Sequence, residues 1–334
     1  MRLMTRRTFF GLLWAPWSSE NPPAARCEYR ASAQIRVFGI PLLSVQNVGG
    51  AHAAHERQGA DAEVSHRLSF LAGSDPSRAR GLNRLGFIRE TICLDSVGIL
   101  GAEYFGFMTA SREESLAEAQ AALKSPAESL APFVAIEGRC DAGRYRAATA
   151  TFLAPIPQHW SQSRHIEPLA IQACRKSAPV SQSAVSGPPI TFLYSLMQVI
   201  HNPASHARYV FFYSHDLHSV EAGREVDVQA GRQLAARGLT SYPEKICRIS
   251  CKVRNQNTGK LSSFTLWVEQ GGACWLPLRF ECRPKRYLSL IFDAVPGAGP
   301  ESHPAGPVSR ASTGGRLKQQ AAPGPWLAQT GTPG

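Results

Sequence analysis

The segment YSHDLH contains the one cluster of histidine and acidic side chains in the sequence, made by His215, Asp216 and His218. Such residues could ligate a metal ion, or His215 could pair with Asp216 as the general base of a hydrolase. Their spacing matches no established metal-ligand pattern, and adjacent residues of a strand point to opposite faces. A polar hairpin turn is the favoured interpretation. The three residues are kept as catalytic candidates, with no metal site and no cofactor expected.

Arginines form the second candidate site. The chain carries 36 lysines and arginines against 25 acidic residues, a formal net charge of +11. Arg78, Arg80, Arg84 and Arg89 could bind a phosphate or an acidic headgroup, although a solvated helix face explains them as well. Both ends of the chain carry part of the positive charge, and the rest is spread along the body, so no specific nucleic-acid binding is predicted. No glycine-rich phosphate loop and no G-x-S-x-G elbow occurs in the sequence.

Eight cysteines raise the question of disulfides or zinc. Cys247 and Cys251 lie four residues apart in an alternating segment, which separates them by roughly 13 Å along a strand. A disulfide needs Cα atoms within about 7 Å, and zinc ligands usually come from tight turns. We therefore expect both to behave as small core residues. A disulfide elsewhere and, less favoured, a metal remain alternatives.

Alternation of apolar and polar residues is clearest between residues 245 and 292. Cys247, Ile249 and Cys251 share one face, and the turn sequences NQNTG and QGG separate this strand from the next two. This pattern predicts a four-strand antiparallel meander with one buried face. Leu276, Leu278, Phe280, Leu288, Leu290 and Phe292 are expected to point into one core.

The remaining sequence indicates further strands and a few helices. The whole predicts a mainly β protein with helices (α+β), whose antiparallel curved sheet or half-barrel ends in the meander. We expect strands at 29–48 (two, broken near Gly39 and Pro41), 64–72, 85–94, 99–108, 209–213 and 221–230, a polar loop at 51–62, and helices at 75–84, 111–124, 158–175 and 190–200.

Both ends of the chain differ in composition from its body. Residues 1–26 resemble an export signal, because arginines, including the pair Arg6 and Arg7, precede a short apolar run. The tail 296–334 is rich in proline and glycine and is expected to be disordered. Between them we expect a region 27–175, a linker 176–189 and a region 190–295. This organisation predicts a periplasmic or secreted protein without a transmembrane segment.

Three stretches carry a family resemblance over roughly residues 28–295: YRASAQIRVFGIPLLS, then PPITFLYSLMQVI followed by YVFFYSHD, and finally FTLWVEQGGACWLPLRFECRP. The chain resembles an exported bacterial family classified as a domain of unknown function, the 3108-type. The resemblance implies a β-rich envelope protein and supplies no catalytic residues. The long insert 75–175 departs from the family pattern and leaves room for a function of its own.

These observations favour a non-catalytic envelope protein that binds a lipid or another apolar ligand. The first alternative is a hydrolase or metal-dependent enzyme centred on His215, Asp216 and His218. The second is a polyanion-binding protein that uses Arg78 to Arg89. The sequence leaves the ligand and the oligomeric state open.

Overall fold

The computed structural model describes residues 25–37, 40–60, 63–79, 84–110, 130–141, 144–155, 157, 159–182, 190–271, 276–285 and 287–296 of the 334-residue chain. The predicted helix 111–124, residues 1–24 of the predicted export signal and the tail beyond Pro296 lie outside these residues.

Strands make up most of the described chain. They are β1 (Ala25–Val37), β2 (Ile40–Ala60), β3 (Glu63–Ser74), β4 (Leu85–Asp95), β5 (Ile99–Thr109), β6 (Leu130–Asp141), β7 (Arg144–Pro155), β8 (Val180–Gln182), β9 (His206–Tyr213), β10 (Asp216–Val226), β11 (Ile246–Asn255), β12 (Leu261–Glu269), β13 (Arg279–Lys285) and β14 (Leu288–Ala294). The helices are α2 (Ile166–Lys176), α3 (Phe192–His201) and α4 (Val228–Ala236), with short 3-10 turns η2 (Trp160–His165) and η3 (Pro243–Lys245).

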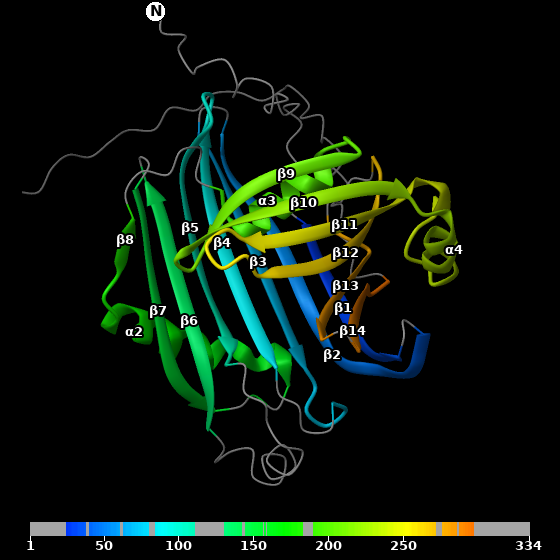
Figure 1. Cartoon of the computed structure of the whole chain (residues 1–334), viewed down its shortest axis with the longest axis horizontal. Coiled ribbons are helices and arrows are strands. Elements are labelled where there is room, and N and C mark those ends of the chain that lie inside the picture. The colour runs from blue at the N-terminus through cyan, green and yellow to red at the C-terminus, as the bar shows by residue number, and fades with distance from the viewer. Residues whose placement is uncertain are drawn as a thin grey trace, which may run out of the picture. The chain divides into compact units, whose positions relative to one another are not determined.

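One antiparallel sheet contains all fourteen described strands, in the order β8-β7-β6-β5-β4-β3-β2-β1-β14-β13-β12-β11-β10-β9. Strand β1 pairs with β14, so the predicted regions 27–175 and 190–295 join in the middle of the sheet. Strands β8 and β9 follow each other in the chain but lie at opposite edges, which leaves the sheet open. The predicted fold class, a mainly antiparallel curved sheet with helices, is confirmed (Figure 1).

Helix α3 packs on one face of this sheet, here called the inner face. Tyr194 and Met197 contact the core of β1 to β3, whereas Val199 contacts the core of β9 to β12. In Figure 1, α3 accordingly lies between the yellow-green strands β9 and β10 and the blue strands behind them. The sheet therefore curves around α3, as expected for the apolar segment 190–200.

The two ends of the curved sheet meet through side chains. Tyr104 on β5 and Tyr145 on β7 both donate hydrogen bonds to the carbonyl oxygen of Ser214, at 3.1 and 2.5 Å, in the turn between β9 and β10. The ring of Tyr145 also lies 4.6 Å from that of Phe212. These contacts hold the β9–β10 turn against β5 to β7, although β8 and β9 do not pair.

Helix α2 covers the opposite, outer face of β5 to β7. Ile166, Ala170 and Cys174 are buried there against the rings of Phe107 and Phe133. The spacing of these three residues, at i, i+4 and i+8, places them on one side of a helix. The helix predicted at 158–175 is confirmed from Ile166 on, whereas Trp160–His165 forms a 3-10 turn with non-helical backbone angles at Gln162.

The predicted meander is confirmed as β11 to β14. Phe280 and Phe292 stack with ring centroids 4.3 Å apart, and Leu276 and Leu290 pack in the same cluster. Leu278 is an exception, because it precedes β13 and packs against Trp267 and α4 instead.

Three predicted boundaries are wrong. The polar loop predicted at 51–62 is the second half of β2, where Ala51 and Ala53 are buried between two long neighbouring strands. Alanine has low strand propensity, and the central position in the sheet overrides it. The strand predicted at 221–230 ends at Val226, because Asp227 accepts a hydrogen bond from the Ala230 amide and starts α4. The linker 176–189 contains the edge strand β8.

Candidate functional site

Among the residues that the structure describes, α3 covers only part of the inner face. Strands β1, β3, β5 and β7 finish at one end of the sheet, here called the open end, whereas α3 packs toward the other end on residues such as Cys27, Leu68 and Ile92. Several large apolar side chains remain exposed at the open end. We call them the uncovered wall: Ile35, Leu43, Val45, Met108, Leu130 and Leu153, with exposed fractions between 36% and 62%.

Register shows that the uncovered wall lies on the inner face. Ile35 is directly opposite Leu43 on β2 and Leu288 on β14, two residues beyond the pair Ala33–Leu290 of the core. Met108 is opposite Val134, which packs in the inner cluster with Tyr104 and Tyr145. Because side chains alternate along a strand, the wall continues the apolar face that α3 covers elsewhere.

Small side chains lie between the part of the uncovered wall on β1 and β2 and the part on β5 to β7. Ala72 on β3 and Gly86 on β4 occupy paired inner positions between β2 and Met108 on β5. Among the described residues, a Cβ atom added to Gly86 would meet only the Cβ of Met108, at 4.0 Å. These residues therefore leave space in front of Gly86 on the inner face.

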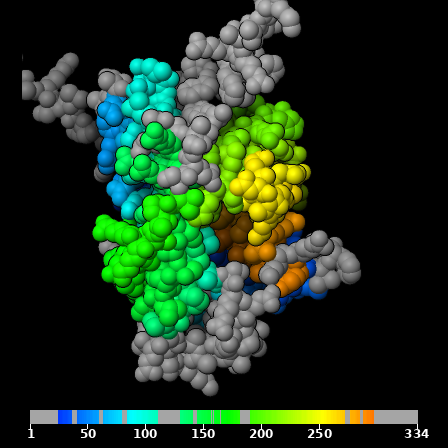
Figure 2. Space-filling model, turned by 60° about the vertical axis from the view of Figure 1, so that its left-hand side comes forward, coloured from blue at the N-terminus to red at the C-terminus, as the bar shows by residue number. Residues whose placement is uncertain are grey.

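A hollow is visible from the side in Figure 2. The orange residues of β13 and β14 lie recessed at its back, between the green β6–β7 side of the sheet and the yellow β11–β12 side. The uncovered wall belongs to the inner face of the same sheet, and apolar surface in a hollow is the usual lining of a ligand site.

A buried carboxylate attaches α3 to the inner face. Glu90 on β4 is 1% exposed and accepts hydrogen bonds from the backbone amides of Leu193 at 2.8 Å and Tyr194 at 3.1 Å. The Thr191 hydroxyl donates to the same carboxylate. Burial raises the pKa of Glu90 to about 7, against the opposing effect of these donors. Glu90 therefore caps the helix from a strand, in place of a capping side chain on α3 itself.

Two histidines are buried beside α3. His55 on β2 and His66 on β3 contact each other through Nε2 and Nδ1 at 2.9 Å, with stacked rings. Burial lowers the pKa of each to about 4, and the charges of neighbouring histidines and Arg57 act in the same direction. Both are therefore neutral near pH 7.

The three catalytic candidates of the YSHDLH segment do not converge. His215 Nε2 lies 3.1 Å from the Thr149 hydroxyl on β7, whereas Asp216 accepts from the side-chain amide of Asn255 at 2.7 Å. His218 stacks on Phe211, with ring centroids 5.3 Å apart. Ser214 and His215 form the β9–β10 turn, whereas Asp216 and His218 lie on β10, where His218 Nδ1 is 3.3 Å from the carbonyl oxygen of Asp216.

Among the described residues, no group of three or more histidines, cysteines, aspartates or glutamates has the geometry to hold a metal ion. Cys247 and Cys251 are each 1% exposed on the inner face, and both are free thiols. Within the same part of the chain, no helix has the length and apolarity to cross a membrane.

The arginine candidates are likewise dispersed. Arg78 lies in the turn after β3, mostly exposed, 3.7 Å from Asp75. Arg84 donates its backbone amide to Ser74, and Arg80 lies outside the described residues. Arg89 forms an ion pair with Glu167 of α2 at 2.7 Å. These positions do not form one anion-binding cluster.

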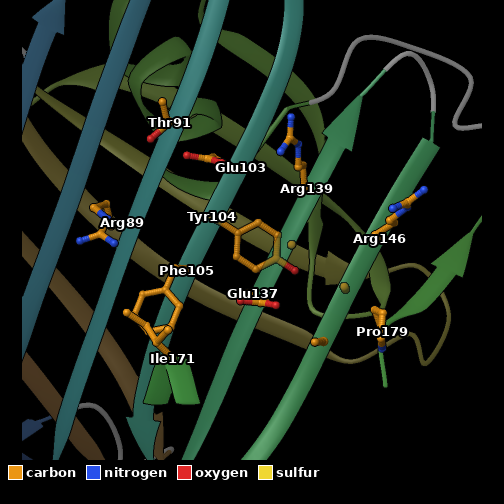
Figure 3. A pocket seen from close by; sticks show the side chains of 13 residues that line it. Arg89, Thr91, Glu103, Tyr104, Phe105, Glu137, Arg139, Arg146, Ile171 and Pro179 are labelled. Atoms are coloured by element: carbon orange, nitrogen blue, oxygen red, sulfur yellow. The ribbon is translucent and has the colours of Figure 1, made fainter. Parts of the chain in front are cut away.

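Arg89 does line a pocket on the outer face, here called the outer pocket. Its cavity volume is about 430 Å³, and Figure 3 shows that its charged side chains project from the four neighbouring strands β4 to β7. Its lining combines charged residues (Arg89, Glu103, Glu137, Arg139, Arg146) with apolar ones (Phe105, Ala148, Ile171, Pro179).

Sequence reasoning missed Glu90, the His55–His66 pair and the outer pocket. Glu90 follows Arg89 in an alternating strand, where a lone carboxylate usually indicates the solvent face. His55 lies in the stretch interpreted as a loop. The charges of the outer pocket come from four strands, and only correct pairing of these strands brings them together.

Comparisons with known proteins identify no family for this chain. No protein-family model matches the chain, so the 3108-type resemblance stays a prediction. No curated protein matches it either. Among solved structures, the chain is similar to a β-barrel-like protein of a domain of unknown function (DUF1849) from Brucella abortus, with a TM-score of 0.43 and 8% sequence identity, over 82% of this chain and 96% of that chain.

Proposed function

We propose that the protein is a non-catalytic binding protein whose inner face holds an alkyl chain, such as a lipid acyl chain, at the open end. The observation that carries the proposal is the uncovered wall. Met108, Leu130 and Leu153 face Ile35 and Leu43 across small inner residues such as Gly86. Contiguous exposed apolar surface in a concave site is typical of ligand-binding grooves.

The chemistry of the wall favours a flexible apolar ligand. The large side chains that form it are aliphatic or methionine, without aromatic rings to select a planar molecule. Aliphatic side chains and methionine gain energy mainly from the apolar area that a ligand covers. A saturated or polyunsaturated hydrocarbon chain fits this requirement better than a polar or rigid ligand does.

Filling the groove tests the proposal. We expect the full chain to bind cis-parinaric acid, a fluorescent fatty acid, and Gly86→Phe to weaken this binding about tenfold or more, because the new ring occupies the open space. Gly223→Phe is the matched control. Gly223 lies on β10, where an added Cβ meets only the His206 ring at 3.7 and 3.8 Å. Equal affinity of the two variants, with both folded, would contradict the proposal.

We also propose a periplasmic or secreted location, supported by the signal-like residues 1–26 of the sequence. Cell fractionation tests this part separately. Replacing Arg6 and Arg7 together by lysine is expected to retain the protein in the cytoplasm, and unchanged export would contradict the twin-arginine interpretation.

A further inference from the structure

The outer pocket lies on the other side of the sheet from the uncovered wall. Its strand residues occupy two adjacent rows: Arg89, Phe105, Glu137 and Ala148 in one, and Thr91, Glu103, Arg139 and Arg146 in the other. Neighbouring strands are about 4.8 Å apart, and residues two apart on a strand about 6.6 Å. The charges on β5 to β7, which are Glu103, Glu137, Arg139 and Arg146, therefore lie within the reach of one small molecule.

Arg89 is already committed to the protein. Its guanidinium pairs with Glu167 at 2.7 Å and lies over the rings of Phe87 and Phe105, at 5.9 and 5.8 Å from their centroids. These contacts fix Arg89 between the sheet and α2. It therefore forms a rigid, charge-balanced side of the pocket.

Three other charges have no such partner. Glu103, Glu137 and Arg146 form no ion pair within the part of the chain that the structure describes. Arg146 is directly opposite Arg139 on β6, so a carboxylate that contacts Arg146 also comes close to Arg139.

The acidic residues lie next to Arg139. Glu103 is opposite Arg139 on β5, and Glu137 precedes Arg139 by two residues on β6, on the same face. Figure 3 shows Arg146 on the side of the pocket toward β8, Glu137 near the middle and Glu103 closer to β4. The pocket thus presents two carboxylates within a short distance of Arg146.

Apolar surface lies between and beside these charges. Phe105 and Ala148 come from the strands, Ile171 from α2 and Pro179 from the segment before β8. A volume of about 430 Å³ falls within the range of pockets that hold small molecules. A ligand that matches this lining needs an anionic group, a cationic group and an apolar side group.

We propose that the outer pocket binds a small zwitterion with an apolar side group, an α-amino acid or short peptide. Its carboxylate contacts the guanidinium of Arg146 beside Arg139, and its ammonium group contacts the carboxylates of Glu137 and Glu103. The apolar side group packs on Phe105 and Ile171. The site is independent of the inner face and does not rest on the function proposed above.

Matched ligands test this assignment. Calorimetric titration of the full chain with L-leucine is compared with N-acetyl-L-leucine, which lacks the ammonium group, and with L-leucinamide, which lacks the carboxylate. We expect binding of L-leucine and about tenfold or greater weakening for each analogue, because each loses a charged hydrogen bond.

Variants identify the contacts. Arg146→Gln is expected to weaken the binding of L-leucine about tenfold or more but to leave the binding of L-leucinamide unchanged. Glu137→Gln is likewise expected to weaken the binding of L-leucine and to leave the binding of N-acetyl-L-leucine unchanged. Arg208→Gln is the control, because Arg208 pairs at 3.7 Å with Glu221 on the exposed surface of β9 and β10. Thermal melts confirm that each variant is folded.

Three outcomes would overturn the proposal. They are the absence of L-leucine binding, equal binding of L-leucine and both analogues, and an unchanged affinity in Arg146→Gln. Tight binding of N-acetyl-L-leucine that does not depend on Glu137 would show a site for anions instead of zwitterions.

Discussion

The inner face under α3 and the inner face at the open end come from the same strands and the same alternation, yet they differ in what covers them. Under α3, Leu68 and Ile92 are at most 1% exposed. At the open end of the neighbouring strands, Met108 is 42% and Leu153 is 62% exposed. An apolar strand face thus becomes a core only where another element packs on it, and elsewhere it is available to a ligand.

The largest expected effect is on the covered side. Phe292 is 7% exposed and stacks on Phe280 at 4.3 Å, so Phe292→Ala removes a ring and leaves a cavity. We expect the free energy of unfolding to fall by about 3 to 5 kcal/mol. Denaturant unfolding measures this loss. A cost under about 1 kcal/mol would show that the two rings are not part of a tightly packed core.

The second effect concerns the attachment of α3. Glu90 has a pKa of about 7 in the folded chain, above its ordinary value, so the native state binds this proton more readily than the unfolded state. This carboxyl group therefore makes the native state more stable as pH falls from about 7 toward 4.5. His55 and His66 act oppositely, because their lowered pKa values remove stability as pH falls below about 6.5.

Glu90→Gln separates these contributions. We expect the stability of the wild type relative to the variant to rise by about 3 kcal/mol between about pH 8 and about pH 4.5, since only the wild type gains the proton. The wild type still loses stability on acidification through the two histidines, and the variant loses more. Unfolding curves at several pH values measure the difference. Parallel pH profiles of the two proteins would contradict a titrating Glu90.

The smallest effect on stability is expected at the uncovered wall. Met108→Ser removes an apolar side chain that is already 42% exposed, so the free energy of unfolding should fall by only about 1 kcal/mol. The same change is expected to weaken fatty-acid binding, because less apolar area is covered. Denaturant unfolding and a fluorescence titration give the two values. A loss above about 2 kcal/mol would place Met108 in the core.

The strands could be predicted from the sequence wherever alternation was regular, as in β11 to β14. Alternation did not predict the second half of β2. Ala51 and Ala53 are buried there because β2 lies between two long strands, and the local sequence does not reveal these neighbours. The pairing of β1 with β14 was equally inaccessible, since it joins residues far apart in the chain.

The candidate sites were harder to predict than the fold. Met108 and Leu153 lie in apolar strand segments, and only the folded arrangement shows that both are exposed. Glu90 is indistinguishable from a solvent-facing glutamate until α3 is placed on it. The YSHDLH segment, in contrast, was correctly interpreted as a polar hairpin turn.

Photochemical cross-linking tests the central claim most directly. A fatty acid with a diazirine on its alkyl chain is bound to the full chain and activated by light, and the adducts are mapped by peptide mass spectrometry. We predict adducts on inner-face residues of the open end, such as Met108 and Leu153, and their loss in Gly86→Phe. Adducts confined to the outer face, or an unchanged pattern in Gly86→Phe, would contradict the account.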